Sequence, residues 1–126
     1  MSISQLVHSN RSNLKGSDLK GCYLAGSNLK GAFLTEANLS LALLSYSCLS
    51  GACCFRTNFS SAHLIRTDFT RASLSEAIFR FADLRSADLN FAVLKRADLS
   101  GARLEGCRMP DGILFQEGMD WREFVK

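Results

Sequence analysis

Apolar and polar positions follow a strict period of five residues along this chain. From Ser12 to Asp111 the sequence divides into twenty consecutive blocks of five without an insertion. The third residue of a block is Leu in fifteen blocks, Phe in three, and Cys54 or Met109 in the others, and the first is always Ala, Ser, Thr or Cys. Neither a helix of period 3.6 nor a flat strand of period 2 keeps such a pattern on one face. The chain is therefore expected to bend every five residues.

The period assigns a role to each position of the block. The third residue points towards a common axis, and the first is small because it points inward beside it. Asn and Asp suit the second position because short polar side chains tolerate turns and bond nearby backbone groups. Gly16, Gly21, Gly26 and Gly31 end successive blocks, where glycine tolerates a positive φ. They lie at separate corners, unlike the glycines of a phosphate-binding loop.

Blocks such as ADLRS, ADLNF, ADLSG and ANLSL resemble the pentapeptide-repeat family, whose motif is A(D/N)LxX. The resemblance covers residues 12–111. It implies an all-β fold, a right-handed quadrilateral parallel β-helix with four blocks per coil and about five coils. At about 4.8 Å per coil the rod is roughly 24 Å tall. We expect an N-terminal cap over residues 1–11, the β-helix over 12–111, and a partly helical C-terminal cap over 112–126.

Residues twenty positions apart stack on one another in such coils, which predicts the core. Burying one central side chain contributes roughly 1.5–3 kcal/mol, so this core needs no cofactor. Cys54 is smaller than Leu, and its coil stays underfilled unless the neighbouring Phe rings expand into the space. The predicted core ladder comprises Leu24, Leu44, Leu64, Leu84, Leu104, Cys54, Phe59, Phe69 and Phe79.

The same stacking predicts two surface features. One column at the block ends alternates in sign and predicts a ladder of ion pairs, with a charged docking strip as the functional alternative; it comprises Glu36, Arg56, Glu76 and Arg96. Exposed ion pairs contribute only about 0–1 kcal/mol each. The second feature is a candidate protein-contact patch on neighbouring coils, formed by Phe33, Cys53 and Phe55. Single exposed apolar groups are normal, whereas a cluster can mark a contact surface.

The ends of a β-helix expose strand edges that need covering. After Asp111 the segment GILFQ keeps Leu114 in phase and predicts a partial twenty-first block. Asp120 and Glu123 have the spacing of a capping box that opens a short helix. Trp121 and Phe124 then close the last coil, or form a dimer contact as C-terminal elements do in some members of the family.

Cysteine and histidine positions favour no catalytic or metal site. The five cysteines fit neither a C-x-x-C pattern nor a zinc spacing, and we expect no metal and no cofactor. Cys53 points outward and Cys54 inward, so these neighbours cannot act as a pair. Cys48 also faces outward, and redox activity of Cys48 or Cys53 stays open. His63 stacks on Asp83, but no nucleophile lies beside them, so no enzyme activity is expected.

Composition narrows the function classes. The 126 residues carry a net charge of +3. Summed over the four faces in chain order, the charges of the repeat are +2, 0, +1 and 0. Basic groups are interleaved with acids, which argues against nucleic-acid binding. The chain has no stretch long and apolar enough for a membrane span and shows no export signal, so we expect a cytoplasmic protein.

These observations favour a non-enzymatic structural or interaction module that contacts a protein through flat faces. The partner is unidentified, and the chain acts as a monomer or as a dimer through its C-terminal end. The family resemblance offers an alternative, because some members mimic a DNA duplex and bind type II topoisomerases. That mimicry needs an acidic surface, which the four face charges do not provide.

Overall fold

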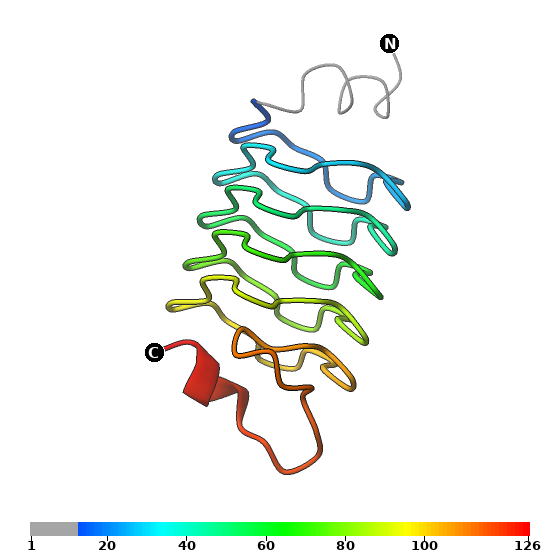
Figure 1. Cartoon of the computed structure of the whole chain (residues 1–126). Helices are drawn as coiled ribbons and strands as arrows, with labels where there is room; N and C mark the ends of the chain where they lie inside the picture. Colours follow the sequence, from blue (N-terminus) through cyan, green and yellow to red (C-terminus); the bar gives the residue numbers. More distant parts are fainter. Residues whose placement is uncertain (1–12) are drawn as a thin grey trace.

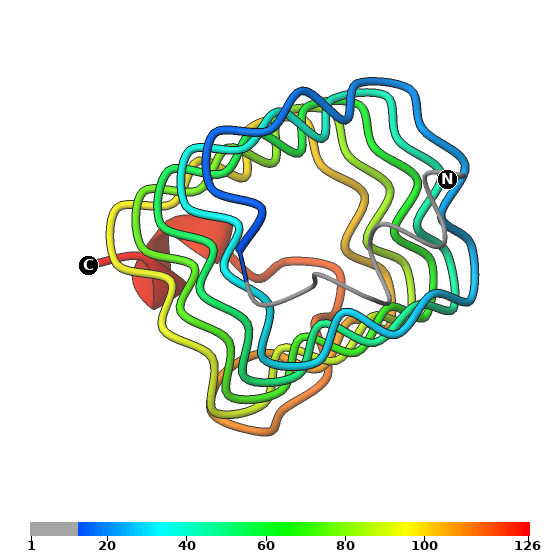
Figure 2. The ribbon, with the colours of Figure 1, turned by 90° about the horizontal axis from the view of Figure 1, so that it is seen from above.

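The computed structural model describes residues 13–126, so the predicted cap over residues 1–11 lies outside the described residues. The chain winds into stacked coils (Figure 1), which form a four-sided tube when seen along the axis (Figure 2). From the N-terminal end the chain turns clockwise as it recedes, which is the right-handed sense. Parallel β-bridges join second-position residues twenty apart, from Asp18 with Asn38 to Asp88 with Arg108. Each coil therefore contains twenty residues.

The walls repeat one set of hydrogen bonds between coils. The third-position N–H donates to the second-position carbonyl of the next coil, as from Leu44 to His63 at 2.8 Å. The same second-position residue donates its own N–H back, here to the Ala42 carbonyl at 2.9 Å. The fifth-position N–H also donates forward, as from Tyr46 to Ile65 at 2.9 Å. These bonds hold the coils in register.

Each corner is a tight turn with a positive φ at the fifth residue of the block. Within the turn, the N–H of the next first-position residue donates to the third-position carbonyl, as from Ser47 to Leu44 at 3.0 Å. From Gly16 to Gly106 the fifth-position φ lies between 54° and 71°, as at the third residue of a type II turn. Twelve of these residues are not glycine. The coil therefore imposes on ordinary side chains a conformation that they rarely adopt.

The frequent Asn and Asp residues at second positions complete the hydrogen bonding of the corners. Their Oδ1 atoms accept the backbone N–H two residues later, at 2.9 Å for Asn58, Asp68 and Asp88. This fourth-position N–H is the one backbone donor of a block that neither the bonds between coils nor the bond within the corner turn uses. The Asn or Asp side chain at the second position thus accepts a backbone N–H that would otherwise lack a hydrogen-bond partner.

The core is the column of central residues inside the tube. The nine residues of the predicted core ladder lie there, each at most 4% exposed: Leu24, Leu44, Leu64, Leu84, Leu104, Cys54, Phe59, Phe69 and Phe79. The rings of Phe59 and Phe79 stack with centroids 4.9 Å apart, and Phe69 meets both edge-on at 5.5 and 5.8 Å. Phe59 and Phe69 belong to the coil that contains Cys54, so large rings and the small thiol share that level of the core.

The repeat ends at Met109, where the chain reverses direction. The predicted twenty-first block does not form, because Leu114 pairs antiparallel with Arg108 and is 43% exposed. The Gly112 N–H donates to the Met109 carbonyl at 2.8 Å, and Gly112 has a φ of 86°. A tight turn therefore replaces the next wall of the β-helix, although the sequence of residues 112–116 still follows the five-residue period.

One helix follows, the 3-10 helix η1 (Trp121–Phe124). Asp120 is its N-cap, and its Oδ1 accepts the Arg122 N–H at 3.0 Å. The Glu123 carboxylate does not complete a capping box, since it pairs with the Lys126 ammonium at 2.9 Å. The predicted start of the helix is correct, but only half of the predicted capping arrangement is present.

Candidate functional site

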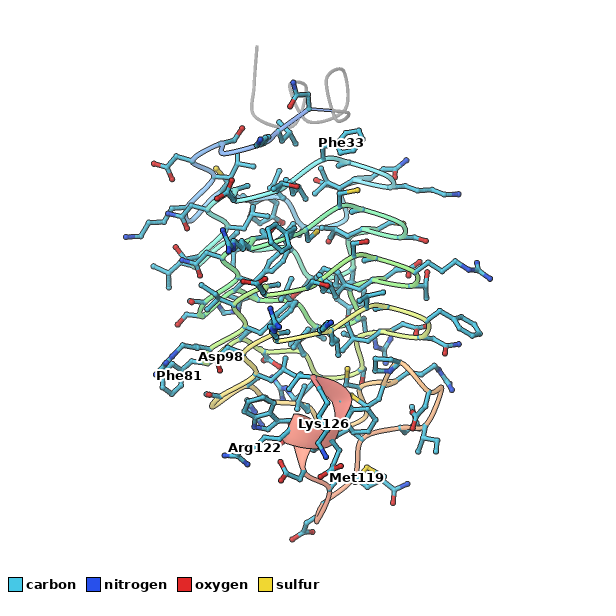
Figure 3. The ribbon with its side chains drawn as sticks, turned by 90° about the vertical axis from the view of Figure 1, so that its left-hand side faces the viewer. Phe33, Phe81, Asp98, Met119, Arg122 and Lys126 are labelled. Carbon is cyan, nitrogen blue, oxygen red and sulfur yellow. The ribbon has the colours of Figure 1, made fainter. Side chains whose placement is uncertain are left out.

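The predicted contact patch lies on face 1, the wall built from the blocks that begin at residues 12, 32, 52, 72 and 92. Phe33 and Cys53 are joined by a parallel bridge, and Phe55 follows at the next outward position. Phe33 is 50% exposed, Phe55 is 37% exposed, and Cys53 is half-buried. Figure 3 shows Phe33 near the N-terminal end of the rod. The second and fourth positions around the patch are uncharged: Phe33, Thr35, Cys53, Phe55, Ser73 and Ser75.

Arginines cover several other exposed aromatic rings. The guanidinium of Arg66 lies 5.9 Å from the centroid of Tyr46, and that of Arg71 lies 5.5 Å from the centroid of Phe91. Cation–π contacts at such distances are favourable by about 0.5–1 kcal/mol at exposed sites. Phe33 has no such partner within residues 13–126.

The corner column beside face 1 contains one ion pair instead of the predicted ladder through Glu36, Arg56, Glu76 and Arg96. Arg56 Nε lies 3.2 Å from Glu76 Oε1, and its guanidinium lies 5.0 Å from the centroid of Phe55. Glu36 and Arg96 make no ion pair within residues 13–126. Holding two long exposed side chains in place costs entropy that a screened pair barely offsets, so alternating signs do not ensure a continuous ladder.

Burial distinguishes the core thiols of Cys54 and Cys107 from the surface thiols of Cys48 and Cys53. Burial raises the pKa of Cys54 to about 12, and burial also raises the pKa of Cys107 to about 12. Both thiols therefore stay protonated and poorly reactive at neutral pH. Cys48 and Cys53 are half-buried at the surface. Within residues 13–126 no three His, Cys, Asp or Glu side chains are grouped to hold a metal ion.

His63 and Asp83 are neighbours in adjacent coils, but they form no catalytic pair. The Asp83 carboxylate accepts hydrogen bonds from Arg85 at 2.9 and 2.7 Å, one to each oxygen. These bonds hold the pKa of Asp83 below its usual range. The carboxylate therefore orients a guanidinium and not the imidazole.

A hollow of about 480 Å³, which the sequence did not indicate, lies at the C-terminal end of the rod. Its lining consists of Ala102, Leu104, Glu105, Gly106, Phe115, Gln116, Glu117 and Trp121. The predicted cap residues Trp121 and Phe124 are partly buried against the core. The only signal in the sequence was that aromatic residues continue after the period ends.

The comparisons with known proteins agree with this geometry. The model of the pentapeptide repeats matches eight copies, over residues 10–45, 22–53, 52–90 and 79–109. The chain belongs to the pentapeptide-repeat family. Such proteins form right-handed β-helices and are generally non-enzymatic structural modules. A comparison with curated proteins gives no match.

Solved structures similar to this pentapeptide-repeat protein share its fold. HetL from the cyanobacterium Nostoc sp. strain PCC 7120, involved in heterocyst differentiation regulation, is 32% identical with a TM-score of 0.80. That match covers 83% of this chain and 44% of HetL, so the chain spans less than half of HetL. A pentapeptide repeat protein from the thylakoid lumen of Arabidopsis thaliana is 24% identical with a TM-score of 0.62, over 83% of this chain and 70% of that one. No helix within residues 13–126 is long and apolar enough to cross a membrane.

Proposed function

We propose that this pentapeptide-repeat protein is a non-enzymatic interaction module that contacts a partner protein through face 1. The observation that carries the proposal is the exposed ring of Phe33, which no arginine within residues 13–126 covers, beside Cys53 and Phe55 on an uncharged stretch of wall. Aromatic side chains with a surrounding polar rim are the usual anchors of protein interfaces. The patch therefore supplies an apolar centre on a rigid surface.

The surroundings of the patch resemble the rim of an interface. The Arg56–Glu76 pair lies at the adjoining corner and leaves the centre of the face free of charge. Rim charges affect the rate of encounter more than the final affinity. We expect the partner to present a flat surface with an apolar centre, because the coils of face 1 form an even wall.

Affinity capture from an extract of the source cells tests this function. The wild type is compared with a Phe33→Ala/Phe55→Ala variant and with a matched Phe81→Ala/Phe91→Ala control, which removes exposed rings elsewhere. We expect the first variant to lose a partner that the control retains, with a loss of affinity of about tenfold or more. Capture of the same proteins by all three forms would contradict the proposal.

The topoisomerase alternative finds no acidic face to support it. The repeat carries twelve Lys or Arg and nine Asp or Glu residues, whereas a DNA mimic must repel DNA and attract basic surfaces. A supercoiling assay should show unchanged topoisomerase activity when the protein is added.

We also infer the organisation of the chain, with a cap over residues 1–11, the β-helix over 12–111 and a C-terminal cap over 112–126. Packing of Trp121 and Phe124 against their own core supports an intramolecular cap over a dimer contact. Location in the cytoplasm, and the choice between monomer and dimer, stay predictions.

A further inference from the structure

Two backbone groups of the last coil lack, within residues 13–126, the hydrogen bonds that their equivalents form one coil earlier. In that earlier coil the Leu84 N–H donates to the Arg103 carbonyl at 2.8 Å, and the Ala82 carbonyl accepts the Arg103 N–H at 2.9 Å. The equivalent groups one coil further on are the Leu104 N–H and the Ala102 carbonyl. Neither has a hydrogen-bond partner within residues 13–126. Unpaired groups of this kind form the edge of a sheet, which can accept another strand.

The C-terminal tail forms hydrogen bonds to the last coil on both sides of this edge but none to the Leu104 N–H or the Ala102 carbonyl. On one side the Arg96 N–H donates to the Val125 carbonyl at 2.7 Å, and on the other the Gly106 N–H donates to the Phe115 carbonyl at 3.3 Å. The twenty-residue register would place Glu123 over the edge, but Glu123 lies in η1. Residues 13–126 therefore supply no strand for these groups.

The hollow of about 480 Å³ lies against this edge, because Ala102 and Leu104 belong to its lining. Its volume is within the range of about 300–1,000 Å³ that is common for ligand sites. Phe115 and Trp121 supply apolar walls, and the carboxylates of Glu105 and Glu117 make the site acidic.

Both carboxylates are available to a ligand. Glu105 lies 4.0 Å from Arg103 Nε and within the electrostatic influence of Arg85, but its side chain is 69% exposed. Glu117 is exposed and makes no ion pair within residues 13–126. A ligand with a cationic group is therefore favoured over an anionic one.

We propose that the hollow binds an extended peptide segment of a partner protein, which adds a strand to the last coil. One peptide residue donates its N–H to the Ala102 carbonyl and accepts the Leu104 N–H. Because side chains alternate along a strand, the next residue points into the hollow towards Phe115 and Trp121, and it is apolar. Because the Phe115 carbonyl already accepts the Gly106 N–H, the added strand ends its pairing there, and the residue after that turns outward towards the Glu105 carboxylate and is Lys or Arg.

The charges favour a peptide over a second copy that docks through its own C-terminal end. Such tail-to-tail stacking would bring two acidic hollows together, where like charges repel. The site is also independent of face 1. Figure 3 shows Phe33 towards the N-terminal end, whereas Met119 and Arg122 lie in the C-terminal tail at the opposite end.

Trp121 provides a direct readout, because it is the only tryptophan in the chain and lines the hollow. The probe is the blocked hexapeptide serine-threonine-valine-leucine-lysine-serine, titrated into the full chain while tryptophan fluorescence is recorded. We expect a saturable change. N-methylation of the valine removes the N–H for the Ala102 carbonyl and weakens binding by about tenfold. N-methylation of the leucine, whose N–H points away from the rod, leaves binding unchanged.

Protein variants test the acidic walls. Glu105→Lys/Glu117→Lys should weaken binding by about tenfold, within the range of two rim charge pairs, whereas Glu76→Lys on face 1 should not. Phe33→Ala/Phe55→Ala should bind the peptide as the wild type does, so failure of the face 1 proposal would leave this result unaffected. No saturable change, or equal binding of both N-methylated peptides, overturns the proposal. So does self-association of the protein that abolishes the fluorescence change.

Discussion

The repeat body (residues 13–109) and the C-terminal tail (residues 112–126) differ in how they use apolar residues. Seven of the fifteen tail residues are apolar, a share close to the 47% of the whole chain. Yet Leu64 in the body is fully buried, whereas Leu114 in the tail is 43% exposed. A body residue has coils above and below it, while a tail residue has the rod on one side only. Burial here depends on stacking and not on composition.

The two regions also differ in backbone pairing. In the body, inner coils pair their N–H groups through walls, turns and Asx side chains. The tail bonds the last coil at Arg96 and Gly106 and leaves the edge between them open. The candidate peptide site lies where the periodic pairing stops.

The largest expected effect is the difference between two leucines at the same position of the five-residue period. Leu64→Ala removes fully buried methyl groups and should lower the free energy of unfolding by about 2–5 kcal/mol. Leu114→Ala should change it by no more than about 0.5 kcal/mol, as is usual for surface sites. Urea unfolding followed by circular dichroism measures both. Equal losses would mean that the tail is packed as the body is.

A smaller effect concerns the thiol of Cys107, where the body meets the tail. Burial raises its pKa from 9.0 to about 12, so the unfolded chain ionises first as the pH rises. The stability that this neutral thiol contributes is full below pH 9 and is lost between about pH 9 and 12, by about 1.4 kcal/mol per pH unit. Cys107→Ala, with the usual first-position residue, should show a shallower fall of unfolding free energy with pH. Identical slopes for wild type and variant would contradict the burial of this thiol.

Substitution of Gly101 and of Gly16 compares the space for a side chain at corners near the two ends of the body. A Cβ at Gly101 would lie 2.5 Å from Cδ1 of Phe81, whereas a Cβ at Gly16 would meet nothing within 4 Å. Gly101→Ala should therefore cost about 1–2 kcal/mol more than Gly16→Ala, which bears only the cost of positive φ. Combining Gly101→Ala with Phe81→Ala should remove the excess in thermal unfolding. Persistence of the excess would show that the ring is not its cause.

The smallest expected effect separates two glutamates of the same corner column. Glu76→Gln breaks the pair with Arg56 and should cost up to about 1 kcal/mol at low salt. Glu36→Gln breaks no ion pair within residues 13–126 and should cost nothing measurable. Because salt screens exposed charges, the difference in unfolding free energy should disappear at about 1 M salt. A cost for Glu36→Gln equal to that of Glu76→Gln would support the continuous ladder.

Most of the repeat body could be predicted because each block repeats the same local information. The central residues, from Leu24 to Leu104, lie inside as the period requires. The ion pairs could not be predicted in the same way, because Glu76, Glu36 and the ring of Phe55 are all candidate neighbours of the Arg56 guanidinium. Which of them it contacts depends on the conformations of the surrounding side chains.

The sequence by itself determined the five-residue period, the identity of the core and the role of Asn and Asp at the corners. These features are local and recur in every coil. The tertiary structure alone decided that residues such as Tyr46 adopt a positive φ, that the chain reverses after Met109, and that an acidic hollow remains beside Leu104. The corners are imposed by bonds to the next coil. At the end of the rod no next coil exists, so packing between distant residues replaces the period.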